Sequence, residues 1–414
     1  MDILFAVFYF SLLYLTVFLM LTLFESGETR FHFYPRKFAV WPMVSVIVPA
    51  FNEAHTISKV VRSALNMDYP KNKLEVIVVN DGSTDNTESV VRKIRDKRIK
   101  ILKQNRKGKG AALNFALDRA KGEFVACLDA DSYVSRNSLK EMLVNFSEKN
   151  ISAVTPIMKV DKPRTTLQKV QKVEYLLAVY VKRILSHINA INVTPGPFSV
   201  YRTDVLRKIG KFDESSIVED QEIAYRMQKY NYRIVQSDRG DVYTVAPKSL
   251  RDLYYQRKRW CKGSWLTFNK YRSIMLDRRY GDFGYFLMPN VLFGLLSCFF
   301  MTIFFGIYVF LPALQVLRHI YIAGFYFNIG SFFNVSEFVS NFVFFTDFYK
   351  LFVIWAFAAI TLFILVRSHK TTSERMSFTE AIPMAVFIFV YYIFLSFIYI
   401  ISTIDLVLKD KHDW

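Results

Sequence analysis

Two carboxylates stand two residues apart, at Asp129 and Asp131, after the apolar run 124–128. Carboxylate oxygens are ligands that suit Mg²⁺ or Mn²⁺, so the pair could share such a cation with a diphosphate. A cation there would neutralise negative charge on a departing diphosphate group. An isolated Asp-x-Asp is more often a turn with capping carboxylates, so the neighbouring motifs must decide between the two interpretations.

A second polar cluster, 80–85, reads Asn-Asp-Gly-Ser-Thr-Asp. These residue types are those of a turn followed by a helix cap, and Asp81 could in addition accept the imide proton of a uracil base. The basic run 106–110 contains Lys109 and opens a predicted helix, where free backbone N–H groups favour phosphate. A solvated loop is the alternative for that run.

Glu219 and Asp220 begin a helical pattern that continues through 223–227. Acidic residues at a helix start often only complement the helix dipole. A carboxylate that is not used by the metal pair could instead take the proton from a hydroxyl as that hydroxyl attacks. Asp220, with Glu219 beside it, is the candidate for this role.

A long basic segment, 248–272, contains Gln256, Arg259 and Trp260. One interpretation is a juxtamembrane helix that lies on anionic lipid. The other is a binding element, because arginine can clamp a diphosphate and an indole can stack on a sugar face.

Four short β-branched runs predict strands, and each is followed by a helical pattern. The predicted strands are 44–50, 74–80, 100–103 and 123–128, and the predicted helices are 53–66, 84–97, 109–121 and 135–149. This alternation predicts a Rossmann-like α/β domain with a mainly parallel sheet and helices on both faces. Such sheets bind ligands at the carboxyl ends of their strands. Asn52, Glu53, Asp81 and Asp129 all follow strands, so we expect one site at this edge.

The composition of the 414 residues is that of a soluble part joined to a membrane part, with 52% hydrophobic and 17% aromatic residues. The net charge of +18 favours an acidic partner such as anionic lipid or a phosphate-bearing substrate. No nucleic-acid-binding module is recognisable, and no protein partner can be identified. The three cysteines lack metal-like spacing, and their odd number argues against a disulfide framework.

The run 3–24 contains no basic or acidic residue and is long enough to cross a hydrocarbon core of roughly 30 Å. It lacks the basic start and small-residue cleavage site of a signal peptide, so we expect an N-terminal transmembrane helix in 1–28. The first basic residues after it are Arg30, Arg36 and Lys37, which by the positive-inside rule place the next domain in the cytoplasm.

The second apolar block, 283–317, has no charged residue, and Pro289 and Pro312 bracket its predicted span. Further spans are predicted at 348–366 and 382–404, with a basic cytoplasmic loop between them. The stretch 319–346 could lie in the interface or form another crossing. We therefore expect a multi-pass protein of the cell membrane with about four transmembrane helices. Its predicted segments are the N-terminal helix 1–28, a cytoplasmic catalytic domain 43–240, interface helices 241–283 and a membrane domain 284–414.

In this order the motifs resemble those of the membrane-integrated family-2 glycosyltransferases with a GT-A fold. That group includes the synthases of cellulose, chitin, hyaluronan and poly-N-acetylglucosamine. The resemblance covers 44–265 and the flanking apolar segments. It is carried by 49–53 (Pro-Ala-Phe-Asn-Glu), 80–82 (Asn-Asp-Gly), Asp129-x-Asp131, Glu219-Asp220, Gln256-x-x-Arg259-Trp260 and the acceptor-lining segment 196–202 (Gly-Pro-Phe-Ser-Val-Tyr-Arg).

The resemblance implies a role for each matching residue. The nucleotide-sugar would contact Pro49, Asn52, Glu53, Asp81, Lys109 and Asp129. Asp131 would bind Mn²⁺ or Mg²⁺ together with Asp129. Asp220 would be the general base, with Glu219 beside the acceptor. A mobile gate over the diphosphate and the acceptor would contain Gln256, Arg259, Trp260, Gly196 and Phe198.

The resemblance also implies a reaction: inverting transfer of a hexose, best N-acetylglucosamine or glucose, from a UDP-sugar to a growing β-linked polysaccharide. The alternative is transfer of one sugar to a membrane lipid, as in the ceramide glucosyltransferases, which carry a similar gate motif. A receptor that senses nucleotide-sugar without turnover is a third possibility, but it would not need Asp220. The chain departs from the family in its small number of spans and in Asn80, where an aspartate is frequent.

Overall fold

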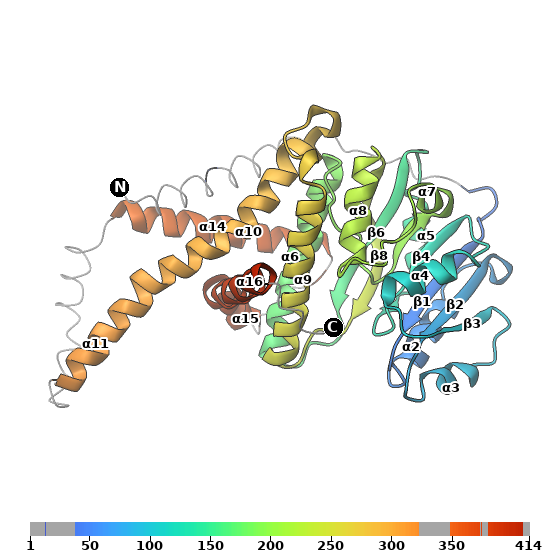
Figure 1. The fold of residues 1–414 in the computed structure, drawn as a ribbon, viewed down its shortest axis with the longest axis horizontal. Helices are drawn as coiled ribbons and strands as arrows, with labels where there is room; N and C mark the ends of the chain where they lie inside the picture. Colours follow the sequence, from blue (N-terminus) through green and yellow to red (C-terminus); the bar gives the residue numbers. More distant parts are fainter. Residues whose placement is uncertain (1–12, 14–37, 323–347, 373, 375–379, 409–414) are drawn as a thin grey trace.

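The computed structural model describes residues 13, 38–322, 348–372, 374 and 380–408. The predicted N-terminal transmembrane helix therefore lies outside the described residues, Leu13 excepted, as does most of the stretch 319–346. The described part consists of a sheet flanked by helices and a second group of helices beside it (Figure 1).

Four parallel strands form one half of the sheet. They are β1 (Val44–Ala50), β2 (Leu74–Asp81), β3 (Ile99–Gln104) and β4 (Phe124–Cys127). The central strand β1 pairs with both β2 and β4, so that Val46 lies opposite Val76 and Ala126. These bounds confirm the four predicted strands to within one residue at each end, because valine and isoleucine fit a pleated, buried surface.

The other half of the sheet is mixed, so the predicted mainly parallel sheet also contains antiparallel pairings. β7 (Ser199–Arg202) is antiparallel to β4 and to β6 (Ile151–Val160), β8 (Arg233–Thr244) is parallel to β6, and β5 (Tyr133–Val134) is antiparallel to β8. The order is β3-β2-β1-β4-β7-β6-β8-β5. β5 and β7 have two and four residues, which is too short for a period-2 pattern to reveal a strand or its direction.

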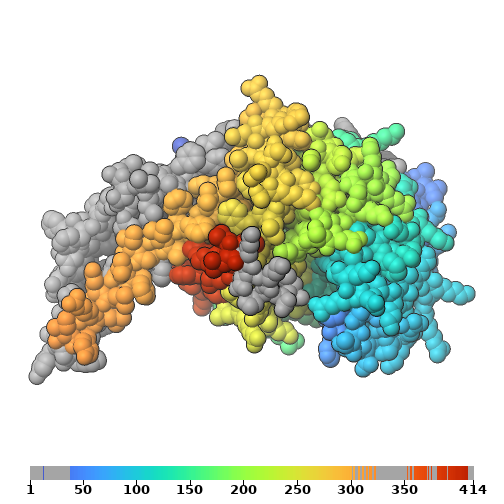
Figure 2. Space-filling model, in the orientation of Figure 1, coloured from blue at the N-terminus to red at the C-terminus, as the bar shows by residue number. Residues whose placement is uncertain are grey.

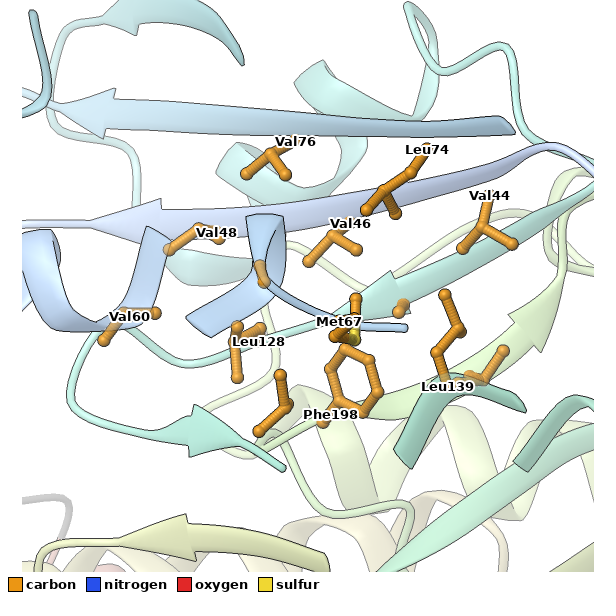
Figure 3. Close-up of a cluster of buried hydrophobic side chains, with 14 of the residues drawn as sticks. Val44, Val46, Val48, Val60, Met67, Leu74, Val76, Leu128, Leu139 and Phe198 are labelled. Atoms are coloured by element: carbon orange, nitrogen blue, oxygen red, sulfur yellow. The ribbon is translucent and has the colours of Figure 1, made fainter. Parts of the chain in front are cut away.

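Successive side chains of β1 point to opposite faces, and helices cover both (Figure 1). Val46 and Val48 face α2 (Ile57–Leu65), α3 (Thr87–Arg92) and α5 (Ser138–Leu143). Ile47 faces α4 (Lys109–Leu117), α7 (Thr203–Lys208) and α8 (Glu219–Lys229). Figure 3 shows the first of these clusters, where Met67 and Phe198 pack against the strand valines.

Two long helices, α6 (Thr166–His187) and α9 (Leu250–Lys270), separate the sheet from the C-terminal helices (Figure 1). A capping box starts α6: Thr165 Oγ1 accepts the Gln168 N–H at 3.2 Å, and Gln168 Oε1 accepts the Thr165 N–H at 3.4 Å. Both helices contribute to one apolar cluster with the C-terminal helices, in which Val170 of α6 and Leu253 of α9 pack with Phe387.

Among the described residues, one helix is long and apolar enough to cross a membrane. It is Phe283–Phe300, with a mean hydropathy of 1.7 over 18 residues. The predicted count of about four spans is therefore not confirmed. The helix begins at η4 (Phe283–Leu287) and continues through α10 (Met288–Phe305), η5 (Gly306–Phe310) and α11 (Leu311–Ile322). α11 extends away from the sheet (Figure 1, Figure 2), and its Leu314 and Leu317 are exposed.

The described helices that follow α11 are α14 (Phe348–Thr371), α15 (Ala381–Val386), η7 (Phe387–Tyr391) and α16 (Tyr392–Val407). α16 is apolar but has only 16 residues. It packs along α9, where the Trp265 indole N–H donates to Thr403 Oγ1 at 2.9 Å. The C-terminal helices are thus joined directly to the helix that carries the predicted gate.

Candidate active site

The loops that follow β1 and β2 are tied to each other by hydrogen bonds. The Asn52 N–H donates to Ser83 Oγ at 3.0 Å, and Asn52 Oδ1 accepts the Thr84 N–H at 2.9 Å. The Glu53 N–H donates to Thr87 Oγ1 at 2.8 Å. These bonds explain why α2 and α3 begin later than predicted, since the preceding residues are held in the loops. Pro49 lies within β1, one residue before its end.

Asp81 is buried beneath the basic loop that precedes α4. One carboxylate oxygen accepts from Gln104 Nε2 at 2.7 Å and from the Lys107 N–H at 2.9 Å, while the other accepts the Gly108 N–H at 2.9 Å. The loop passes close to Gly82, where a Cβ would stand 2.8 Å from the Arg106 nitrogen. Asp81 therefore shapes this loop, and its predicted contact with uracil stays a prediction.

Lys109 stands at the centre of the acidic residues. Its Nζ lies 2.6 Å from Asp129 Oδ1 and 2.7 Å from Glu219 Oε1. Burial alone would lower the pKa of Lys109, yet Asp129, Glu219 and Asp220 hold that pKa well above its usual value. Burial alone would raise the pKa of Glu219, but Lys109 brings it below its ordinary range, so this carboxyl stays ionised. The structure thus joins the start of α4, the end of β4 and the start of α8.

Gly196 passes directly over this centre. A Cβ at Gly196 would lie 2.5 Å from Lys109 Nζ and 2.6 Å from Asp129 Oδ2, so any other residue would force these two side chains to move. The Gly196 N–H donates to Asp220 Oδ2 at 3.2 Å. The backbone carbonyl of Asp220 accepts from both the N–H and the hydroxyl of Thr194, at 3.1 and 2.8 Å. The segment before β7 is therefore fixed against the first turn of α8.

Asp220 has the protonation behaviour expected of a proton acceptor. Burial first, and then the charge of Glu219, raise its pKa to about 6 against the opposite effects of Lys109 and Arg259. A carboxyl with a pKa near 6 is ionised at neutral pH and is a better base than an ordinary aspartate. The Asp220 carboxylate can therefore accept a proton from a hydroxyl that lies within hydrogen-bond distance of it.

Asp131 is the second carboxylate of the predicted metal pair. Solvent reaches it, but the surrounding protein removes hydration, and this loss together with the charges of Asp129 and Glu53 raises its pKa to about 6. No group of three or more histidine, cysteine or acidic residues suited to a metal exists in the described chain. Asp129 and Asp131 fit a divalent cation whose further ligands come from a diphosphate, because their mutual repulsion would be relieved by a positive charge.

Three of the five predicted gate residues lie on α9 beside this centre: Gln256, Arg259 and Trp260. Arg259 lowers the pKa of both Glu219 and Asp220, so its charge reaches the acidic centre. Trp260 packs against the cluster of Val160, Tyr175 and Ala246. The structure does not bring the Phe198 side chain to the site: it is fully buried in the core between the sheet and α2 (Figure 3). The position of Phe198 in the predicted acceptor-lining segment 196–202 did not indicate which way its ring points.

Three residues at the site have no place in the sequence motifs, and all lie on α6. The Tyr175 hydroxyl hydrogen-bonds the Gln256 side chain, and the charge of Asp131 reaches the same hydroxyl. Burial lowers the pKa of Lys182 to about 8, while Asp220 opposes that change. Glu174 contacts Arg257. The sequence offered little signal for them, because α6 also contains Lys169, Lys172 and Arg183.

Two proteins with curated descriptions resemble part of the chain. The poly-beta-1,6-N-acetyl-D-glucosamine synthase of Staphylococcus epidermidis is 31% identical over 225 residues, which are 53% of this chain and 54% of the relative. The synthase of the same description from Staphylococcus aureus is 28% identical over 268 residues, 64% of either protein. The similarity spans less than two thirds of each relative's length.

A solved structure and a family match complete the comparison. The mannosyltransferase PcManGT from Pyrobaculum calidifontis, solved with GDP-Man and Mn²⁺, aligns over 99% of this chain and 100% of its own, with a TM-score of 0.58 and 19% identity. That likeness supports a GT-A-like mixed sheet with helices. Residues 45–210, which include Asp81, Lys109, Asp129 and Asp131, match the family described as glycosyl transferase family 2. This match, together with the two synthases, makes the segment 45–210 similar to glycosyl transferase family 2.

Proposed function

We propose that this chain is an inverting glycosyltransferase that moves a hexose from a UDP-sugar to a growing β-linked polysaccharide at the membrane. The observation that carries the proposal is the environment of Asp220. This carboxyl has a pKa of about 6 and lies beside the Lys109–Glu219–Asp129 centre. A proton acceptor next to a site for a diphosphate is what glycosyl transfer requires.

In the proposed reaction an acceptor hydroxyl attacks the anomeric carbon of the donor sugar. Its proton passes to Asp220, and the bond between the anomeric carbon and the diphosphate oxygen breaks, so UDP leaves with the electron pair. One displacement inverts the configuration, which converts an α-linked donor into a β-linked product. Lys109 and Arg259 supply positive charge where the leaving diphosphate becomes more negative.

A divalent cation, Mn²⁺ or Mg²⁺, fits the carboxylates of Asp129 and Asp131. When bound, it would stabilise the charge of the departing diphosphate as a Lewis acid. The solved mannosyltransferase with the same fold contains Mn²⁺ and a nucleotide-sugar. The predicted nucleotide-sugar residues Pro49, Asn52, Glu53 and Asp81 would bind the rest of the donor.

N-acetylglucosamine is the proposed donor sugar, and a polysaccharide the proposed acceptor. The support comes from the relatives in two staphylococci, which are described as poly-N-acetylglucosamine synthases. The motif Gln256-x-x-Arg259-Trp260 of the predicted gate, which resembles that of the polymerising glycosyltransferases, favours the same proposal. Addition of a single sugar to a lipid remains an outcome that the product of the reaction can reveal.

A membrane location with a cytoplasmic catalytic domain is part of the proposal. The apolar helix Phe283–Phe300 and the exposed leucines of α11 support insertion. The basic segment 248–272 directly precedes that helix, which suits contact with anionic lipid headgroups at the cytoplasmic surface.

The experiment is an incubation of the purified chain in lipid nanodiscs with Mn²⁺ and a panel of UDP-sugars. UDP release and product size are followed together. Release with UDP-N-acetylglucosamine and a high-mass product would support the polymerising function. A single discrete glycolipid would move the assignment to a lipid glycosyltransferase, and no release with any donor would overturn the proposal.

A further inference from the structure

A polar cluster outside the sequence motifs connects the gate helix to the helices on either side of it. Arg257 of α9 donates to Glu174 Oε2 of α6 at 2.7 Å. The Tyr391 hydroxyl, from η7 in the C-terminal part, donates to the same oxygen at 2.8 Å. One carboxylate oxygen therefore joins three helices that are distant in the sequence.

The cluster lies directly against the gate. The guanidinium carbon of Arg257 stands 4.2 Å from the centre of the Trp260 ring, close enough for a cation–π contact. Trp260 also packs against the buried Tyr175 of α6. The Tyr175 hydroxyl hydrogen-bonds the Gln256 side chain. Arg257 is thus placed between the carboxylate that neutralises it and the indole that it supports.

The burial of this ion pair argues for a role in geometry. Only 5% of the Arg257 side chain and 20% of the Glu174 side chain are exposed. A buried ion pair is costly to desolvate, and apolar residues of similar volume often stabilise a fold equally well. A planar guanidinium fixed by a carboxylate holds its orientation better than an apolar side chain does, because its hydrogen bonds are directional.

We propose that Glu174 and Tyr391 are positioning residues that hold Arg257 against Trp260 and so align the indole for the acceptor sugar. The inference rests on the proposed glycosyltransferase function and extends it to α6 and to the C-terminal helices. The consequence is that acceptor binding depends on the contacts of Glu174 with Arg257 and Tyr391, whereas donor binding depends on the loops after β1, β2 and β4. Neither Glu174 nor Tyr391 touches the substrate in this account.

The test compares Glu174→Gln and Tyr391→Phe with a matched control, Asp405→Asn. Asp405 of α16 also binds α9, through Lys258 Nζ at 2.5 Å and Lys262 Nζ at 3.3 Å. Its loss weakens the same helix packing without touching Arg257. The full chain in nanodiscs is assayed with UDP-N-acetylglucosamine as donor and a β-1,6-linked N-acetylglucosamine tetrasaccharide as acceptor, and Tm is measured for each variant.

Glu174→Gln should raise the acceptor KM by on the order of tenfold and leave the donor KM unchanged, since a misplaced binding group affects only its own ligand. Tyr391→Phe keeps the ion pair and loses one hydrogen bond, so it should fold normally and show a smaller change in the same direction. Asp405→Asn should lower Tm and leave the acceptor KM at the wild-type value.

The possible outcomes separate this inference from the function on which it rests. A wild-type chain that releases no UDP would overturn the proposed function, and the positioning role with it. A wild-type chain that turns over, with Glu174→Gln and Tyr391→Phe indistinguishable from Asp405→Asn, would overturn the positioning role alone. An increase of the acceptor KM in both variants but not in Asp405→Asn would support it.

Discussion

At the scale of single residues, the site contains two neighbouring carboxyl groups, Glu219 and Asp220, whose pKa values are shifted in opposite directions. Glu219 is paired with Lys109 and stays ionised, whereas Asp220 is held by a backbone N–H and keeps a raised pKa. Adjacent positions in the sequence thus have different chemistry because only one of them reaches the lysine. The two side chains are predicted to have different effects on substitution.

Asp220→Asn is expected to lower the rate of sugar transfer by about 10²- to 10⁴-fold, because the amide cannot accept the proton of the attacking hydroxyl. The amide oxygen can still accept the Gly196 N–H, so the fold should be retained. UDP release and product formation are measured together with UDP binding. Asp204→Asn is the control, since Asp204 is exposed at the start of α7. Unchanged transfer by Asp220→Asn would remove the proposed base.

The pH dependence of transfer follows from the same carboxyl. Only ionised Asp220 accepts a proton, so with a pKa of about 6 the rate should fall as the pH decreases through 6 and should be level above it. Glu219 and Asp129 raise this pKa, whereas Lys109 and Arg259 lower it. The rate is measured at saturating donor and constant Mn²⁺, with UDP binding followed at each pH. A rate that stays constant from pH 7 to about pH 4, near the ordinary pKa of aspartate, would contradict this assignment.

Gly196→Ala tests the contact between backbone and acidic centre. The new Cβ would stand 2.5 Å from Lys109 Nζ and 2.6 Å from Asp129 Oδ2, so the pair must move apart. We expect transfer to fall by on the order of 10²-fold, the usual effect of a shift of about 1 Å at a reacting centre. Gly294→Ala is the matched control, because a Cβ there meets nothing within 4 Å. Equal activity of both variants would show that the close approach is dispensable.

At the scale of helices and strands, the predictable part of the chain is the part with regular sequence patterns. β1 and β2 are recognised because valine and isoleucine follow one another between polar ends. α6 escapes recognition as a site element because Lys182 lies near the charge of Asp220, whereas Glu174 and Val170 contact the C-terminal helices. Its two functions disturb the apolar periodicity. Phe198 is the opposite case, because it was predicted to line the site but its side chain is buried in the core.

The packing of α9 on α8 gives a prediction at this scale. Gly263 of α9 lies against Val218 at the start of α8, and a Cβ on Gly263 would stand 2.0 Å from Val218 Cγ2. Gly263→Ala should therefore destabilise the fold by about 1–3 kcal/mol through overpacking. The measurement is the unfolding midpoint in detergent. Adding Val218→Ala removes the clashing methyl and should restore part of the loss; no recovery would mean that the two helices do not approach this closely.

At the scale of the whole molecule, the candidate active site is connected to the C-terminal helices through α9 and α6. The gate helix α9 contacts α8, whose first turn contains the proposed base Asp220. It also packs along α16. The mixed half of the sheet supports α6, which reaches the C-terminal helices through α14 and α15. Sequence motifs mark the residues at the sheet edge, but they contain no information on this layer of contacts. Substitution of Tyr391, which lies in this layer, is therefore expected to influence catalysis without touching a substrate.

Two forces could hold this molecule at a bilayer, and an extraction experiment distinguishes them. The chain has 54 basic and 36 acidic residues, so adsorption to anionic lipid alone would be reversed by about 1 M salt, where charges are screened within roughly 3 Å. Insertion of Phe283–Phe300 and the exposed leucines of α11 would resist both salt and alkaline carbonate, because apolar surface gains nothing by entering water. We expect the protein to stay in the membrane fraction under both washes and to leave it only with detergent. Release by salt would show that its positive surface, and not an inserted helix, accounts for its location, and the proposed membrane topology would then be wrong.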